Sequence, residues 1–141
     1  MTGSSAQPDA TPVELVRAYL QAWNDHDGPA VVATLVEGGT YVDPTLPAPI
    51  GGQVLADYVA GLAAVFPDLR FDVGQLTAEG DRVVAQWRMH GTNTGPLPGV
   101  PQPTGGTCDL PGVDVITVGL GGIVSVVGYF DQKTFVEQLD R

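Results

Sequence analysis

Residues 108–130 read CDLPGVDVITVGLGGIVSVVGYF. Two segments rich in β-branched residues, Cys108–Leu120 and Ile123–Phe130, flank the pair Gly121-Gly122, and this arrangement predicts a β-hairpin. Asp114 shares its strand parity with the apolar residues that follow it, so its carboxyl group is expected on their face. The hairpin is therefore expected to carry one acidic group on an otherwise apolar face.

The segments before the hairpin extend the sheet. Leu69–Thr77 and Arg82–His90 alternate in hydropathy and are joined by the turn Glu79-Gly80-Asp81, which predicts a second pair of antiparallel strands. Gly38–Asp43 predicts a short strand, and the segment Thr92–Thr107, rich in Gly, Pro and Thr, predicts a long connection.

Helical patterns occupy the first half and the C-terminus. Thr11-Pro12-Val13-Glu14 carries the capping residue, the proline and the acid of a helix start, and apolar residues then recur at helical spacing as far as Trp23. Further helices are predicted at Pro29–Val36, Gln53–Phe66 and Asp131–Arg141. Helices followed by antiparallel strands indicate an α+β fold, with the helices packed on one face of a curved sheet and a pocket for a small apolar ligand between them.

Length and composition restrict the function. The chain has 141 residues, 43% of them hydrophobic, which suits a single domain over residues 11–141 after a disordered tail at residues 1–10. The net charge is −10 and the six Lys and Arg residues are scattered, so neither nucleic acid nor an anionic membrane is an expected partner. No apolar run approaches the roughly 18 residues that a membrane span needs. The single cysteine, Cys108, fits a reducing cytoplasm.

Three polar residues stand where apolar residues are expected. Tyr19 interrupts the apolar stripe of the first helix, Asp43 ends a strand before Pro44, and Asp114 lies on the apolar face of the hairpin. Each has an ordinary structural explanation: a core tyrosine bonded to a carbonyl group, a turn aspartate, or a buried acid with a partner. Convergence of the three on one pocket would instead favour a catalytic site, in which Asp114 has a raised pKa and Asp43 stays ionised.

Metal and cofactor chemistry is not indicated. His26 and His90 are far apart and lack the spacing of metal ligands, so no metal site is expected. The glycines of Gly91–Gly106 do not follow a strand and open a helix, so no dinucleotide site and no other cofactor is expected. Arg88 and His90 share one strand face, which could line the mouth of a pocket or face solvent.

Almost all of residues 11–141 resembles nuclear-transport-factor-2-like proteins, in particular the SnoaL-like polyketide cyclase branch. The resemblance is carried by Val16–Asn24, Gly91–Gly95, Gly99–Gly105, Val113–Ile116, Gly122–Val124, Tyr129–Asp131 and Gln138-Leu139. It implies a cone-shaped fold of N-terminal helices on a curved, mainly antiparallel sheet. The superfamily hosts many activities, so the resemblance is more specific for the fold than for the function.

Steroid Δ-isomerases of this superfamily combine a tyrosine in the first helix, an Asp-Pro after the first strand and a protonated aspartic acid on a late strand. Tyr19, Asp43 and Asp114 match those motif positions. The resemblance therefore implies that Asp43 removes a proton next to a ketone while Tyr19 and a neutral Asp114 donate hydrogen bonds to the developing enolate. These are the roles of the corresponding groups in ketosteroid isomerase.

The chain departs from two other branches of the superfamily. The catalytic acid of the cyclases aligns with Gly128, and Asp131 follows three residues later in the same closing motif. Limonene epoxide hydrolases use an Arg-x-Asp pair where this chain has Arg88-Met89-His90, so epoxide hydrolysis is not expected. Double-bond isomerisation and polyketide-type ring closure both begin with enolate formation, and the resemblance leaves both open.

The leading expectation is a cofactor-independent isomerase or cyclase that acts on an apolar cyclic or polyketide-like compound; the alternative is a non-catalytic ligand-binding or dimerisation module of the same fold. The substrate pocket is expected to be lined by Trp23, Tyr58, Phe66, His90, Ile116, Tyr129 and Asp131. The apolar strand face of Val83, Ala85, Trp87 and Met89 is expected on the convex side of the sheet, where it would support a homodimer or a higher homo-oligomer.

Overall fold

A computed structural model describes residues 10–96 and 102–140. The predicted tail lies outside the described residues except for Ala10, as does the middle of the predicted long connection. The described elements, in chain order, are α1 (Pro12–Asn24), α2 (Gly28–Ala33), β1 (Leu35–Val42), α3 (Gly52–Val65), β2 (Arg70–Glu79), β3 (Arg82–Thr92), β4 (Thr107–Gly119), β5 (Gly122–Tyr129) and α4 (Gln132–Leu139).

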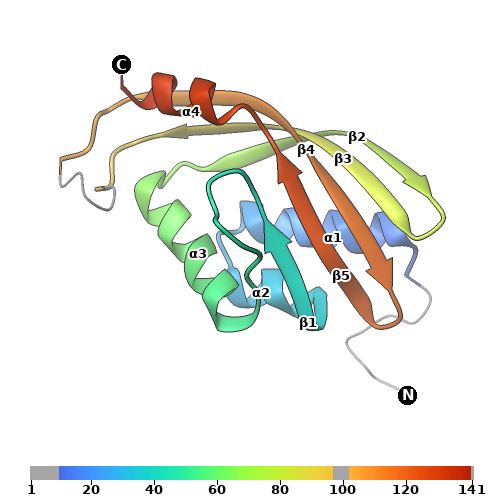
Figure 1. Ribbon diagram of the computed structural model, residues 1–141. Coiled ribbons are helices and arrows are strands. Elements are labelled where there is room, and N and C mark those ends of the chain that lie inside the picture. Colours follow the sequence, from blue (N-terminus) through green and yellow to red (C-terminus); the bar gives the residue numbers. More distant parts are fainter. Residues whose placement is uncertain (1–9, 97–101, 141) are drawn as a thin grey trace.

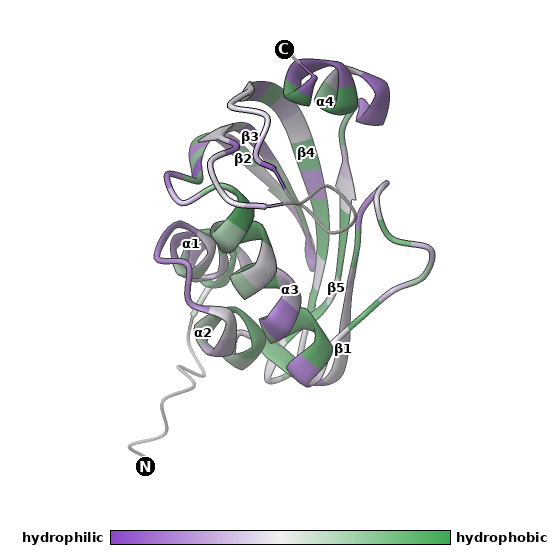
Figure 2. Ribbon diagram, turned by 90° about the vertical axis from the view of Figure 1, so that its left-hand side faces the viewer, coloured by the Kyte–Doolittle hydropathy of each residue, from purple (hydrophilic) through white to green (hydrophobic). Residues whose placement is uncertain are grey.

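The five strands form one curved sheet in the order β1-β5-β4-β3-β2 (Figure 1). Neighbouring strands from β2 to β5 are antiparallel, and β1 is parallel to β5. Helices α1, α2 and α3 lie on one face of this sheet, and α4 lies at one end of it (Figure 2). We call the face toward α1–α3 the inner face and the opposite face the outer face.

The start of α1 follows the predicted capping pattern. The backbone N–H of Glu14 donates to Thr11 Oγ1 at 3.1 Å, and the backbone N–H of Thr11 donates to Glu14 Oε1 at 2.8 Å. At its other end the helix is tied to β2, because the Asn24 side chain donates to the Phe71 carbonyl oxygen at 3.0 Å and accepts from the Phe71 N–H at 2.7 Å. The buried stripe of α1 is thereby fixed against the sheet.

The prediction for the second helix was wrong at its C-terminal end. Helix α2 stops at Ala33, and β1 begins at Leu35, where the sequence predicts helix as far as Val36. Leu35 is in register with Ile123 of β5, whose N–H donates to the Thr34 carbonyl oxygen at 2.9 Å. Pairing with a strand almost ninety residues later therefore decides the conformation of a short apolar run that local spacing leaves ambiguous.

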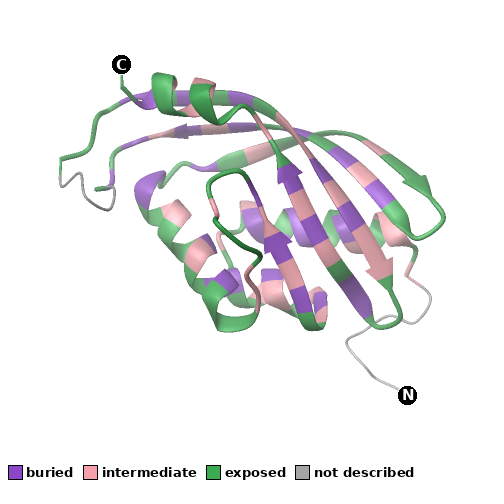
Figure 3. Cartoon of the chain, viewed as in Figure 1, coloured by how far each residue is buried: buried purple, intermediate pink, exposed green. Residues whose placement is uncertain are grey.

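Buried and exposed residues alternate along the central strands (Figure 3). Val83, Ala85, Trp87 and Met89 are all buried on the inner face of β3, which corrects the prediction that they form a convex surface. Along β3 these buried residues alternate with residues that face solvent: Arg82, Gln86 and Arg88. The alternation identifies residues that share a face, but it does not say which of the two faces the helices cover.

Candidate active site

A cavity of about 430 Å³ lies between the inner face of the sheet and the helices. Eight of the ten aromatic residues of the chain line it: Trp23, Tyr41, Tyr58, Phe66, Phe71, Trp87, Phe130 and Phe135. Their rings contact one another around the cavity, with ring centroids 5.2 Å apart for Phe71 and Trp87 and 5.8 Å apart for Trp23 and Tyr41. The volume and the apolar walls suit a small cyclic ligand.

Two carboxyl groups, those of Asp43 and Asp114, face this aromatic cavity, and each residue is only 6% exposed. They come from different elements, because Asp43 follows β1 and Asp114 lies in the middle of β4. No Lys, Arg or His occurs among the described residues that line the cavity. The site therefore combines apolar walls with acidic groups and no neutralising cation from those residues.

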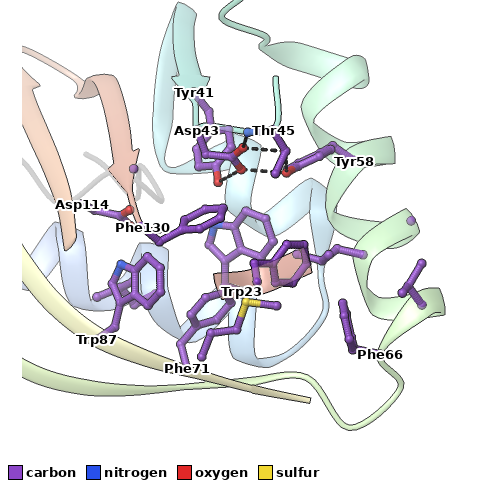
Figure 4. Close-up of a pocket in the computed structure, with 17 residues that line it drawn as sticks. Trp23, Tyr41, Asp43, Thr45, Tyr58, Phe66, Phe71, Trp87, Asp114 and Phe130 are labelled. Atoms are coloured by element: carbon purple, nitrogen blue, oxygen red, sulfur yellow. Dashed lines mark hydrogen bonds between the residues drawn. The ribbon is translucent and has the colours of Figure 1, made fainter. Parts of the chain in front are cut away.

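Asp43 is held by four hydrogen bonds (Figure 4). The hydroxyl groups of Tyr41 and Tyr58 donate to its Oδ2 atom at 2.6 Å and 2.7 Å. The Thr45 backbone N–H and hydroxyl group donate to its Oδ1 atom at 2.8 Å and 2.6 Å. Strand parity brings Tyr41 to Asp43, the turn after Pro44 brings Thr45, and α3 brings Tyr58, so three separate segments orient this carboxylate.

Asp114 has the opposite environment. None of residues 10–96 and 102–140 completes a hydrogen bond to its carboxyl group, although the indole N–H of Trp87 comes close enough to lower its pKa. Burial raises the pKa of this carboxyl group to about 7, the nearby indole N–H of Trp87 opposes that rise, and the charge of Asp43 adds to it. The indole nitrogen of Trp87 lies on the side of the ring toward Asp114 (Figure 4) but forms no hydrogen bond there. The raised pKa agrees with the placement of Asp114 on an apolar strand face.

A glycine separates the two acids. Gly128 of β5 is the register partner of Asp114. A Cβ atom at position 128 would stand 3.1 Å from Asp114 Oδ1 and 3.5 Å from the Cβ atom of Asp43. The carboxyl group of Asp114 thus lies beside the space that a side chain at position 128 would enter, which is where the cyclase resemblance expects an acid.

Tyr19 of α1 lies close to Asp114. It is fully buried, its hydroxyl group has no hydrogen-bond partner among the described residues, and it is not part of the cavity wall. Asp114 is close enough to raise the pKa of the Tyr19 hydroxyl group, although burial is the larger cause. The structure therefore brings Tyr19 near Asp114 but leaves its hydroxyl group behind the residues that face the cavity.

Three of the seven predicted pocket residues, Trp23, Tyr58 and Phe66, line the cavity, and four do not. Ile116 is buried on the inner face without contributing to the wall. The other three predictions are corrected by strand parity and capping. His90 lies on the outer face beside Asp72 and Asp109, Tyr129 is 57% exposed, and Asp131 caps the N-terminus of α4.

Several residues of the site are not predicted from the sequence. Tyr41 could have been found, because it is two residues from Asp43 and shares its strand face. Trp87 was placed on the wrong face, and nothing in the local sequence connects Thr45, Phe71, Phe130 or Phe135 to one cavity. The described part of the chain contains no group of three or more His, Cys, Asp or Glu residues arranged to hold a metal ion.

Comparison with known proteins agrees with this architecture. The family model for the SnoaL-like domain matches residues 16–126. The chain is similar to a proposed polyketide cyclase from Xanthomonas campestris pv. campestris, with 28% sequence identity, a TM-score of 0.81, and 91% of this chain and 96% of that chain covered. A proposed SnoaL-like polyketide cyclase from Jannaschia sp. CCS1 has 25% identity and a TM-score of 0.80, with 99% and 97% covered.

A third similar structure is a protein with a ketosteroid isomerase-like fold from Catenulispora acidiphila DSM 44928, solved in complex with trimethylamine. It has 21% identity and a TM-score of 0.75, with 92% of this chain and 94% of that chain covered, and this likeness concerns the fold alone. No curated protein matches the sequence significantly. The predicted nuclear-transport-factor-2-like fold is confirmed, and since the family match spans most of the chain, the protein belongs to the SnoaL-like domain family.

Proposed function

We propose that this protein is an enzyme that transfers a proton at a carbon atom next to a ketone in an apolar cyclic or polyketide-like compound. One observation carries the proposal: two buried carboxyl groups with contrasting hydrogen-bond environments face one aromatic cavity. Pairs of titratable groups with such contrasting environments are typical of acid–base sites. The similarity to proposed polyketide cyclases supports the same class of chemistry.

The chemistry begins with enolate formation. A carboxylate accepts the proton from carbon, and the electron pair of the broken C–H bond moves onto the ketone oxygen. Return of a proton to another carbon gives isomerisation, and attack of the enolate on a second carbonyl group gives ring closure. The resemblance assigns the base to Asp43 and the enolate donors to Asp114 and Tyr19. We retain Asp43 and Asp114 as the catalytic pair. Tyr19 lies behind these two residues as a buried hydrogen-bond donor that does not face the cavity.

The substrate is proposed from the cavity walls. Aromatic side chains dominate them, so a flat or polycyclic ring system with few polar groups fits best. The volume of about 430 Å³ lies within the usual range for small-ligand sites. We propose that the reaction needs no cofactor. We retain a cytoplasmic location as part of the proposal, on the basis of the free, buried Cys108. As a separate finding, no helix of the described residues is long and apolar enough to cross a membrane.

The test is solvent exchange at carbon. The protein is incubated with 2-tetralone in D2O, and deuterium incorporation next to the carbonyl group is followed by NMR. The double variant Asp43→Asn/Asp114→Asn keeps the shape of the cavity and removes both bases, so catalysed exchange should disappear while binding of the ketone remains. A non-catalytic binding module would bind 2-tetralone without accelerating exchange in the unmodified protein, and that result would contradict the proposed function.

We also propose that the protein self-associates through the outer face of the sheet. This face carries half-buried valine side chains on three neighbouring strands that no described helix covers: Val84 of β3, Val113 and Val115 of β4, and Val127 of β5. Apolar side chains left on an uncovered sheet are typical of interfaces. The partner expected from this proposal is a second copy of the chain.

A further inference from the structure

The two carboxyl groups of the cavity differ in the lone pairs that remain free. An ionised carboxylate offers about four acceptor positions. Asp43 uses four of them for Tyr41, Tyr58 and the two donors of Thr45. To take a proton from a substrate carbon, Asp43 would first have to release one of these charge-assisted hydrogen bonds, which are among the strong ones in proteins.

Asp114 has no such obstacle. Among the described residues, the indole N–H of Trp87 approaches its oxygen atoms without completing a hydrogen bond, and the carboxyl group faces the cavity from the middle of β4. Its Oδ1 atom lies beside Gly128, where the missing side chain leaves room for a ligand to approach. A buried polar group without a partner is costly, so a group retained in this state next to a cavity is a candidate for direct contact with the ligand.

On these grounds we infer that Asp114, and not Asp43, exchanges the proton with the substrate, and that Asp43 keeps its four hydrogen bonds beside the reacting group. The inference rests on the proposed function. In the step itself the C–H bond next to the ketone breaks, its proton forms an O–H bond with the Asp114 carboxylate, and the electron pair moves onto the ketone oxygen. Delivery of the proton back to carbon restores the carboxylate.

The electrostatic surroundings of Asp114 agree with this role. The titratable groups that interact electrostatically with it are Asp43, Tyr19 and Tyr41, and the described cavity wall supplies no cation. Burial and the charge of Asp43 therefore hold the pKa of Asp114 near neutrality. A carboxylate of this kind is a stronger base than an ordinary one, and a large fraction of it is still ionised at pH 7.

The pH dependence of exchange in the unmodified protein distinguishes the two assignments by its sign. If ionised Asp114 is the base, the rate of catalysed 2-tetralone deuteration rises with pH through a midpoint near 7 and then levels off, with the same midpoint as an NMR titration of the Asp114 carboxyl carbon. If Asp43 is the base and neutral Asp114 is the donor, the rate falls over the same range. A falling profile would overturn the inference and leave the proposed function intact.

Single variants give a second readout. Asp114→Asn should lower the rate by roughly 10²-fold or more, as is usual for loss of a general base. Asp43→Asn should lower the rate less than Asp114→Asn does, and its pH midpoint should move to lower pH because a negative neighbour has gone. Exchange that is lost in Asp43→Asn and kept in Asp114→Asn would contradict the inference. If Asp43→Asn does not fold, the wild-type pH profile still decides the question.

Discussion

Asp114 and Gly128 face each other across β4 and β5, and Asp114 Oδ1 lies 3.1 Å from the point where a Cβ atom at position 128 would stand. That distance is shorter than ordinary van der Waals contact, so a side chain at position 128 would require the carboxyl group to shift. On its other side the same point is 3.5 Å from the Cβ atom of Asp43. The absence of a side chain at position 128 is therefore what lets both acids approach one space.

Gly128→Ala should raise the pKa of Asp114 above its present value of about 7. The added methyl group removes water from the carboxyl group and offers it no hydrogen bond, so the neutral form is favoured further. The expected rise is up to about one unit, and the tight fit should cost roughly 1–3 kcal/mol of stability. NMR titration of the Asp114 carboxyl carbon measures the first effect, and urea unfolding measures the second.

Gly61→Ala is the matched control for this substitution. Gly61 also lines the cavity, but a Cβ atom there has no neighbour within 4 Å and the residue lies inside α3. Alanine is favoured over glycine by about 1 kcal/mol at such a position, so the control should be as stable as the wild type or slightly more stable. Its Asp114 pKa should be unchanged. An equal pKa rise in both variants would show that Gly128 has no special relation to Asp114.

The stability of the protein should depend on pH through Asp114. The folded pKa of about 7 exceeds the unfolded value of about 3.9, so the folded state binds this proton more tightly. The contribution of the neutral acid is complete below pH 4 and is lost as the pH rises to about 7. Asp114→Asn lacks this loss, so its stability relative to the wild type should increase over that window by up to roughly 4 kcal/mol.

Urea unfolding of both proteins between pH 3 and pH 9 measures the difference. The difference should be nearly constant above pH 8, where the wild-type carboxyl group is fully ionised. Asp72→Asn is a useful comparison, because this exposed acid on the outer face has its pKa lowered by Arg70 and should show the opposite sign at low pH. A flat difference for Asp114→Asn would mean that the buried acid titrates normally.

The order of helices and strands could be predicted from the sequence because periodicity is local. The conformation of Leu35 and Val36 could not, since it depends on pairing with β5. The sequence also could not show which face of β3 the helices cover. Alternation groups the residues of each face, but it does not say which group is inside until the helices are placed. The same limit applies to the site: parity placed Asp114 on an apolar face, but the four donors to Asp43 come from three segments that only the tertiary fold brings together.

Self-association through the outer face should weaken when a charged residue is placed at the centre of that face. Val115 lies in β4 with its side chain on that face, flanked by β3 and β5. Val115→Lys should shift the protein toward a monomer in sedimentation velocity at micromolar concentration. Val54→Lys, at an exposed position of α3, carries the same change away from the sheet and should leave the association unchanged. A wild-type protein that is monomeric at that concentration would contradict the proposed interface.

The charge of the cavity should make it selective among ligands of one shape, and the chain carries its own reporter of binding. Both of its tryptophan residues, Trp23 and Trp87, line the cavity, so a nitroaromatic ligand that enters it should quench the intrinsic fluorescence.

Nitrobenzene is neutral and should quench in a saturable way. 4-Nitrobenzoate has the same ring with a negative charge, and repulsion by Asp43, by ionised Asp114 and by the net charge of −10 should weaken its binding at least tenfold. Because Asp114 is neutral below its pKa of about 7, this penalty should be smaller at pH 5 than at pH 8.5. Trp23→Phe and Trp87→Phe should each leave one emitter that reports the same order of affinities. Equal affinity for the neutral and the anionic ligand at pH 8.5 would show that the two carboxyl groups do not control what enters the cavity.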